Sequence, residues 1–168
     1  PLLSGGTGSV SHTEEVPSFL PDRFEPGTPN IPGILGLHAA LCDLEQTDMD
    51  KLHQHELELT QYFINGLMQM DPSESTLRAI GKHNTIERTS VVSVQTLQTD
   101  MARVAYEMDD TYGIMTRVGL HCAPSAHKTL GTYPEGTIRF SFGPENTHHE
   151  VDLALHALAE ITGSPYHL

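Results

Sequence analysis

Hydrophobic residues recur at helical spacing in four stretches of the chain. The first stretch is apolar on nearly all sides, which is typical of a helix buried between two bodies, and the other three are amphipathic. The last begins with a capping box formed by Thr147 and Glu150 and ends at Gly163. The pattern therefore predicts helices over residues 34–44, 49–70, 97–112 and 147–163.

A shorter period, rich in Ile, Val and Thr, occupies the stretches between these helices and is typical of strands. It predicts strands over residues 76–81, 88–95, 114–118 and 137–142. In the last strand Ile138 and Phe140 alternate with Arg139. Because successive side chains of a strand point to opposite faces, we expect Arg139 to point away from the core.

From residue 49 onward the predicted order is helix, two strands, helix, two strands, helix. Strands covered on one face by helices form a two-layer α+β domain, and residues 49–168 have the usual size of one. Thr47 and Asp50 have the spacing of a helix N-cap and its third-position acceptor, which marks the start of this domain. Residues 1–48 are a separate segment of loop followed by the apolar helix.

Charge and cysteine usage narrow the possible partners and location. Twenty-two acidic residues against 9 basic ones give a net charge of -13 without a basic cluster, so we expect neither nucleic-acid nor membrane partners. No apolar run approaches the roughly 18 to 20 residues of a membrane span. The 2 cysteines form no CxxC pair and no secretory signal opens the chain, so we expect a cytoplasmic protein.

Cys122 is the strongest candidate for chemistry. It follows a predicted strand, between His121 and Pro124, in a turn where a thiol can be exposed. A nucleophilic cysteine requires this exposure and a stabilised thiolate. The alternative is a half-buried small hydrophobe. Cys42, within the apolar helix, is predicted to belong to a core.

Other polar residues allow more than one interpretation. His121, Cys122 and His127 could bind zinc, but a structural zinc site requires four closely spaced ligands, so we expect no metal. Arg139 and Arg117 could each bind a carboxylate through two parallel hydrogen bonds or form a surface ion pair. The backbone N–H groups of residues 5–9 could form a nest for one phosphate, or this stretch is a flexible loop.

Five motifs, in their order and spacing, together resemble the C-terminal region of a cysteine desulfurase, a pyridoxal-phosphate enzyme of the class V aminotransferase fold. The resemblance covers essentially the whole chain. The motifs are Ser4-Gly5-Gly6-Thr7-Gly8-Ser9, Leu20-Pro21-Asp22-Arg23-Phe24-Glu25-Pro26-Gly27-Thr28-Pro29-Asn30, Arg117-Val118-Gly119-Leu120-His121-Cys122-Ala123-Pro124, Gly136-Thr137-Ile138-Arg139-Phe140-Ser141 and Asn146-Thr147.

The resemblance implies a role for each part of the chain. Residues 1–48 would be the end of the large cofactor-binding domain, and residues 49–168 the small C-terminal domain. Cys122 matches the cysteine that takes the substrate sulfur as a persulfide, and Arg139 matches the arginine that binds the substrate carboxylate. The substrate would be cysteine, which becomes alanine. The sulfur would pass to an acceptor, which could be a sulfur-acceptor protein.

The resemblance also implies contacts with the substrate and the cofactor. Arg117 and His121 match polar residues that flank the cysteine loop. Gly6 or Thr7, and Thr28, match positions that reach the phosphate of pyridoxal phosphate in the other subunit of the family's homodimer. The active site would therefore be composite.

The lysine that binds the cofactor in this family follows a histidine upstream of the glycine loop, and the sequence begins after that point. The pair His127-Lys128 looks similar but follows Cys122, inside the small domain, so we do not interpret Lys128 as the cofactor lysine. We expect these 168 residues alone to be inactive.

Two alternatives remain open from the sequence. The parent protein could carry another activity of the class V aminotransferase fold, such as that of a selenocysteine lyase or an aminotransferase, in which Cys122 is incidental. It could also be a non-catalytic interaction module whose acidic surface docks a partner.

Overall fold

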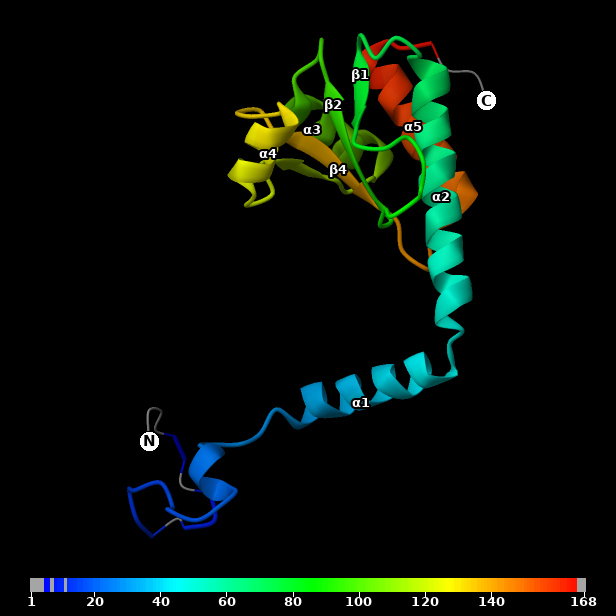
Figure 1. Cartoon of the computed structure of the whole chain (residues 1–168). Coiled ribbons are helices and arrows are strands. Elements are labelled where there is room, and N and C mark those ends of the chain that lie inside the picture. Colours follow the sequence, from blue (N-terminus) through cyan, green and yellow to red (C-terminus); the bar gives the residue numbers. More distant parts are fainter. Residues whose placement is uncertain (1–4, 7, 11, 166–168) are drawn as a thin grey trace. The chain divides into compact units, whose positions relative to one another are not determined.

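The computed structural model describes residues 5–6, 8–10 and 12–165. The chain forms two compact units, Pro1–Asp48 and Met49–Leu168, which are described separately below. The helices and strands of both units are labelled in Figure 1.

The first unit contains a short 3-10 helix, η1 (Asp22–Phe24), and the helix α1 (Ile31–Gln46). The side chain of Asn30 caps α1 by accepting a hydrogen bond of 3.1 Å from the backbone N–H of Gly33. No residue of α1 is buried within this chain, although the helix is apolar on nearly all sides. Cys42, predicted to lie in a core, is half-buried beside His38.

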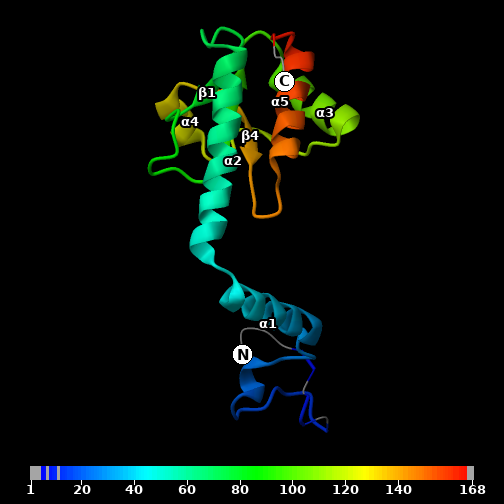
Figure 2. The ribbon, with the colours of Figure 1, turned by 90° about the vertical axis from the view of Figure 1, so that its right-hand side faces the viewer.

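The second unit is the predicted two-layer α+β domain. Its antiparallel sheet has the strand order β1-β2-β4-β3, and three helices pack on one face of this sheet (Figures 1 and 2). The strands are β1 (Leu77–Ile80), β2 (Val91–Thr96), β3 (Arg117–Gly119) and β4 (Thr137–Ser141), and the covering helices are α2 (Met49–Met70), α3 (Met101–Tyr112) and α5 (His148–Thr162).

The core lies between the three helices and the sheet. Phe63 of α2 is fully buried, and its ring centroid lies 4.7 Å from that of Phe140 and 5.3 Å from that of Phe142. Ile138, from the same strand as Phe140, is also fully buried. Arg139 lies between them in β4 and therefore points to the opposite face, as predicted.

Helix ends follow their capping signals. The side chain of Thr147 accepts from the backbone N–H of Glu150, whose carboxylate accepts from the Thr147 backbone N–H, so the predicted capping box begins α5. Gly163 and Gly113, with φ of 69° and 68°, end α5 and α3 in the left-handed conformation. The helix α3 begins at Met101, capped by Asp100, and not at residue 97.

Further differences between the sequence predictions and the structure concern Thr47, the third strand and a short helix. Thr47 is the C-cap of α1, where its hydroxyl donates to the Asp43 carbonyl, so it is not the N-cap of α2. The strand predicted over residues 114–118 forms only at Arg117–Gly119. The helix α4 (Pro124–Leu130), which lies between β3 and β4, was not predicted.

The connection from α2 to β1 is built around one buried carboxylate. Asp71 accepts backbone hydrogen bonds from Thr76 (2.6 Å) and Leu77 (3.0 Å) and a hydroxyl hydrogen bond from Ser73 (2.8 Å). Burial alone would raise the pKa of Asp71, but these donors outweigh it and hold the pKa well below its ordinary value. Asp71 is therefore charged throughout the neutral range and fixes the start of β1.

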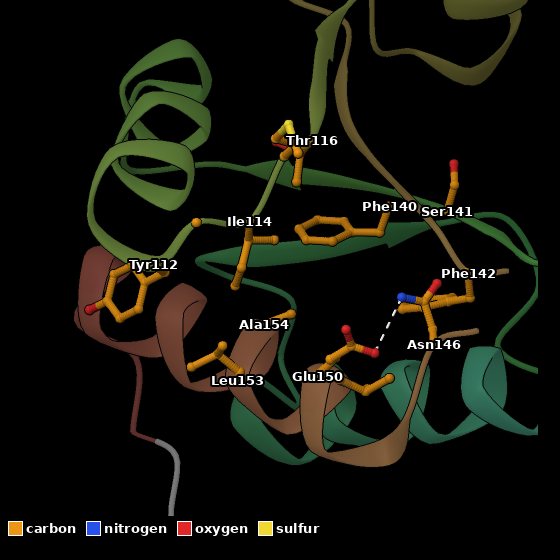
Figure 3. Close-up of a pocket in the computed structure, with 13 residues that line it drawn as sticks. Tyr112, Ile114, Thr116, Phe140, Ser141, Phe142, Asn146, Glu150, Leu153 and Ala154 are labelled. Carbon is orange, nitrogen blue, oxygen red and sulfur yellow. Dashed lines mark hydrogen bonds between the residues drawn. The ribbon is translucent and has the colours of Figure 1, made fainter.

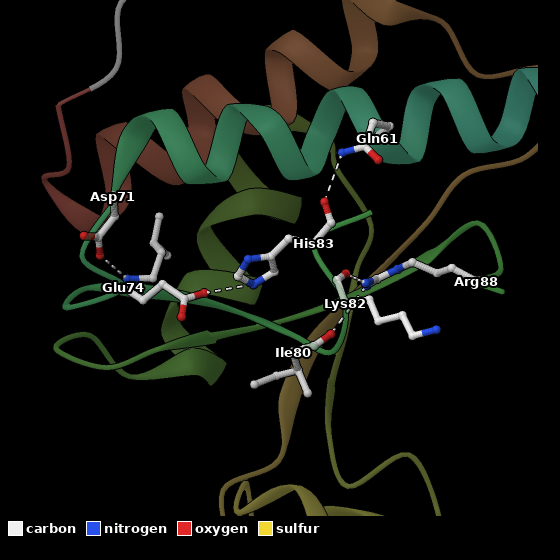
Figure 4. Close-up of polar contacts among 8 residues, drawn as sticks. Gln61, Asp71, Glu74, Ile80, Lys82, His83 and Arg88 are labelled. Atoms are coloured by element: carbon white, nitrogen blue, oxygen red, sulfur yellow. Dashed lines mark hydrogen bonds and ion pairs between the residues drawn. The ribbon is translucent and has the colours of Figure 1, made fainter. Parts of the chain in front are cut away.

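The connection from β1 to β2 is held mainly by contacts to backbone carbonyls (Figure 4). The Arg88 guanidinium donates to the carbonyls of Lys82 and Ile80, and Gln61 of α2 donates to the His83 carbonyl. His83 also faces Glu74, with Nε2 3.3 Å from the carboxylate. These contacts join the loop to α2. They give the polar residues of the loop a structural role.

Among the described residues, no helix is both long and apolar enough to cross a membrane.

Candidate functional site

Two arginines lie side by side on the sheet face that α2, α3 and α5 leave open. Arg139 of β4 is paired in register with Arg117 of β3 on one side and with Ser93 of β2 on the other. The Nε atom of Arg139 is buried and has no hydrogen-bond partner in the described part of the chain. Paired guanidinium groups with free donors attract a carboxylate, so the open face can bind a small acid.

Cys122 lies in the turn that follows β3. His121 and Cys122 both have positive φ, 50° and 58°, and the turn closes through a hydrogen bond of 2.8 Å from the Ala123 N–H to the Leu120 carbonyl. Left-handed backbone is costly for residues other than glycine, so the neighbouring contacts must hold this conformation. The consequence is an exposed thiol, which is one of the two alternatives that the sequence left open and the one that a nucleophile requires.

The thiol of Cys122 faces positive charge. Its Sγ lies 4.0 Å from Nη2 of Arg117, which is the partner of Arg139 across the strand pair. A guanidinium is thus the charged group beside this thiol. The chain therefore brings Cys122, Arg117 and Arg139 to one end of the open sheet face.

His121 connects the turn to β4. Its Nε2 lies 3.1 Å from Oγ1 of Thr137, a buried residue two positions before Arg139. Burial lowers the pKa of His121, and the positive charge of Arg139 lowers it further. The imidazole is therefore neutral near pH 7, and its Nδ1 is buried without a hydrogen-bond partner among the described residues.

Sequence reasoning missed two residues of this site. Thr137 anchors His121, but a threonine at the start of a strand carries no signal of such a role. His127 was considered only as a metal ligand, whereas its ring lies behind His121, with ring centroids 5.7 Å apart. Within the described residues, no three His, Cys, Asp or Glu side chains converge as a metal site would require.

Lys128 lies on α4 with an exposed side chain. Its Nζ is 5.1 Å from the ring centroid of Tyr133, a contact typical of a cation against an aromatic face. The structure thus places Lys128 on the surface of the second unit.

The glycine motifs of the first unit lie next to each other. The Gly27 N–H donates to the Gly6 carbonyl at 3.0 Å, and a Cβ at Gly5 would lie 3.0 Å from Pro26. Glycine is required there because two backbone segments approach closely. Thr28, the next residue after Gly27, is exposed and offers its hydroxyl; Thr7 lies outside the described residues.

These features fit a phosphate-binding loop. Backbone N–H groups near glycines, together with a hydroxyl, are the donors that hold phosphate groups in proteins. Gly6 and Thr28 belong to two segments that a backbone hydrogen bond joins, so both could contact one phosphate.

A hollow of about 360 Å³ lies on the other side of β4, toward the helices (Figure 3). Phe140, Phe142 and Leu153 line it, with Glu150 and Asn146 at one side. None of the predicted site residues lines this hollow. The candidate site is therefore on the open face, where the arginines and the thiol meet, and not in this cavity.

Comparisons with known proteins agree with these motifs. Residues 1–154 match the family model described as Aminotransferase class-V. The chain belongs to this family. A probable cysteine desulfurase of Pyrococcus abyssi is 34% identical over 167 residues, and a probable cysteine desulfurase 2 of Mycobacterium leprae is 34% identical over 154 residues. These alignments cover 98% and 90% of this class-V chain but only 39% and 35% of the two relatives.

The solved structures give the same result for the fold. The apo structure of a cysteine desulfurase from Thermococcus onnurineus superposes on 85% of this chain with a TM-score of 0.72 and 33% sequence identity. The match covers 34% of that protein. The class-V chain therefore spans about a third to two-fifths of the length of the proteins it matches.

Proposed function

We propose that the protein containing this chain is a pyridoxal-phosphate-dependent cysteine desulfurase, with Cys122 as its nucleophile. The observation that carries the proposal is the exposed thiol 4.0 Å from Arg117, on a turn next to the paired arginines. A surface cysteine without a role requires neither a strained turn nor a cationic neighbour.

Arg139 would bind the carboxylate of the substrate. Its half-buried position and its free Nε donor suit a bidentate grip, and Arg117 on the next strand adds positive charge. Arg117 would thus attract both the substrate carboxylate and the Cys122 thiolate, and the neutral His121 would fix the turn between them. Together these residues would hold the substrate thiol near Cys122.

The sulfur transfer requires no external oxidant. The Cys122 thiolate attacks the substrate sulfur and forms an S–S bond, while the substrate Cβ–S bond breaks and its electron pair remains with the carbon. A proton then adds to this carbon, so cysteine becomes alanine and Cys122 carries a persulfide. The exposure of Cys122 would leave this persulfide accessible to a sulfur-acceptor protein.

Pyridoxal phosphate, when bound, supplies an electron sink that weakens the bond from the substrate carbon to sulfur. In this chain Gly6, Thr7 and Thr28 are the proposed phosphate contacts, reaching the cofactor of the other subunit in a homodimer. The residues that hold the substrate and accept the sulfur would then come from the second unit.

The test uses the full-length protein with pyridoxal phosphate and cysteine. Cys122→Ser should reduce alanine formation by about a thousandfold or more, because the hydroxyl of the introduced serine is a far weaker nucleophile toward sulfur than a thiolate. Cys42→Ser is the matched control and should retain full activity. Formation of alanine at the original rate by the Cys122→Ser protein would refute the proposal.

The same assay with selenocysteine as substrate distinguishes a cysteine desulfurase from a selenocysteine lyase. If Cys122→Ser abolishes turnover of cysteine but leaves release of selenium from selenocysteine unchanged, selenocysteine is a substrate that does not require the nucleophile. If neither amino acid is turned over by the unmodified protein, the enzymatic proposal fails.

A further inference from the structure

The helix α4 places a buried imidazole behind the cysteine turn. His127 is 6% exposed, and its Nδ1 lies 2.6 Å from Oγ1 of Thr132, which is 1% exposed. The Thr132 backbone N–H also donates to the His127 carbonyl at 2.9 Å. One residue thus fixes both the backbone and the ring of His127.

The fixed ring of His127 contacts His121. The two ring centroids are 5.7 Å apart with an angle of 43° between the ring planes. On its other side, His121 reaches Thr137 of β4 through Nε2. The His121 imidazole is therefore held between α4 and β4, and it immediately precedes Cys122 in the chain.

We infer that His127, held by Thr132, is a positioning residue for His121 and thereby for the Cys122 turn. The inference rests on the proposed function of Cys122 as a sulfur acceptor. Both His121 and Cys122 have positive φ, and the only backbone hydrogen bond that closes the turn among the described residues runs from Ala123 to Leu120. Side-chain contacts must supply the remaining restraint.

The site also brings several charges to His121. Burial disfavours protonation of His121 most, and Arg139 of β4, His127 of α4 and Arg117 of β3 disfavour it further. If the His127 ring loosens, His121 gains solvent and moves relative to Thr137. The distance between Cys122 and Arg117 would then no longer be fixed, and the thiol would no longer be held in its exposed position beside the guanidinium.

The alternative is that the Thr132–His127 bond only closes the end of α4. Gly131 already caps this helix, with φ of 69° and backbone bonds to its last turn. A purely structural role would affect the stability of the domain but not the reactivity of the thiol. The experiment must therefore read both properties.

The test uses the 168-residue chain with Cys42→Ser, so that Cys122 is the single cysteine. In this background Thr132→Val removes the hydroxyl with little change in volume, and Thr132→Ser retains it. The rate of alkylation of Cys122 by iodoacetamide is measured between about pH 6 and 9, with chemical denaturation in parallel. The His121 pKa is followed by NMR, with assignment from His121→Gln.

Thr132→Val should lower the alkylation rate near neutral pH by about three- to tenfold and raise the pKa of His121 toward its ordinary value. Thr132→Ser should behave as the unmodified chain. If Thr132→Val does not fold, His127→Phe takes its place, because it keeps a ring but has no nitrogen to bond Thr132. It should show the same lower alkylation rate and the same rise in the His121 pKa. Loss of stability with an unchanged alkylation rate and an unchanged His121 pKa overturns the inference.

These readouts do not depend on turnover. If the full-length protein makes no alanine but Thr132→Val still changes Cys122 reactivity, the proposed function fails and the positioning role stands. If alanine is made and the Cys122 thiol of Thr132→Val reacts at the unmodified rate, the proposed function stands and the positioning role fails.

Discussion

The two faces of the sheet differ in what their residues do. On the helix-covered face, Ile138 and Phe140 are apolar and buried in the core, where Phe140 contacts Phe63 of α2. On the open face, Arg139 and Arg117 place two positive charges next to each other, which contributes no stability by itself. The covered face therefore determines whether the domain folds, and the open face carries the groups that we propose for chemistry.

The largest effect is expected on the covered face. Phe63→Ala should reduce the free energy of unfolding by about 3 to 5 kcal/mol, because a fully buried ring that contacts two others leaves a cavity. Arg139→Gln on the open face is the comparison and should change it by no more than about 1 kcal/mol. Chemical denaturation measures both. Equal losses would mean that the two faces are not functionally separate.

The second effect tests the edge at which α2 leads into the sheet. Asp71→Ala should cost about 2 to 3 kcal/mol, because the N–H groups of Thr76 and Leu77 lose a charged acceptor. Since the folded pKa is below the ordinary value, this stability is present above about pH 4 and is lost as the pH falls further. Asp71→Asn retains one acceptor oxygen and should lose less. An unfolding free energy that does not depend on residue 71 would contradict this account.

The third effect concerns the close approach of β3 and β4 beside the site. A Cβ at Gly136, where φ is 84°, would lie 2.2 Å from the Gly119 carbonyl oxygen, so Gly136→Ala should cost about 2 to 3 kcal/mol. At Gly131, φ is 69° but nothing lies within 4 Å, so Gly131→Ala should cost only about 1 kcal/mol. The difference between these denaturation midpoints isolates the steric contribution. Equal costs would show that only the backbone conformation matters.

Alternation along β4 was enough to predict the orientation of Arg139. Because Ile138 and Phe140 are buried on one face of the sheet, Arg139 must point to the other face. The capping signals at Thr147 and Gly163 were equally direct, since they act within a few residues. Local patterns thus predicted the layers and the helix-covered face, but they left open whether Cys122 is exposed or half-buried.

The parts that sequence did not predict depend on contacts between distant residues. Positive φ at His121 and Cys122 has no propensity signal, because the contacts to Thr137 and Arg117 maintain it. Thr47 has the residue type of an N-cap but ends the preceding helix. The helix α4 is only 7 residues long, although Pro124 at its start and Gly131 after its end could have indicated it.

The smallest effect is a pH dependence confined to the open face. Burial and the charge of Arg139 lower the pKa of His121 in the folded chain, whereas in the unfolded chain the pKa is about 6.5. Below that pH the unfolded chain binds a proton that the folded chain resists, so stability is complete above it and falls as the pH decreases. The unfolding free energy, measured by denaturation between about pH 8 and 5, should show that unfolding takes up less than one proton. The His121→Gln variant should lack this uptake.

Arg139→Gln should reduce this uptake, because removal of the guanidinium lets the pKa of His121 rise toward its ordinary value. Ile138→Val, the neighbouring change on the covered face, should lower stability equally at every pH. If Arg139→Gln leaves the pH dependence unchanged, the charge of Arg139 does not reach His121, and the grouping of both residues in one site is wrong. If it reduces the dependence while the Ile138→Val curve stays parallel to the original, electrostatics on one face act independently of packing on the other.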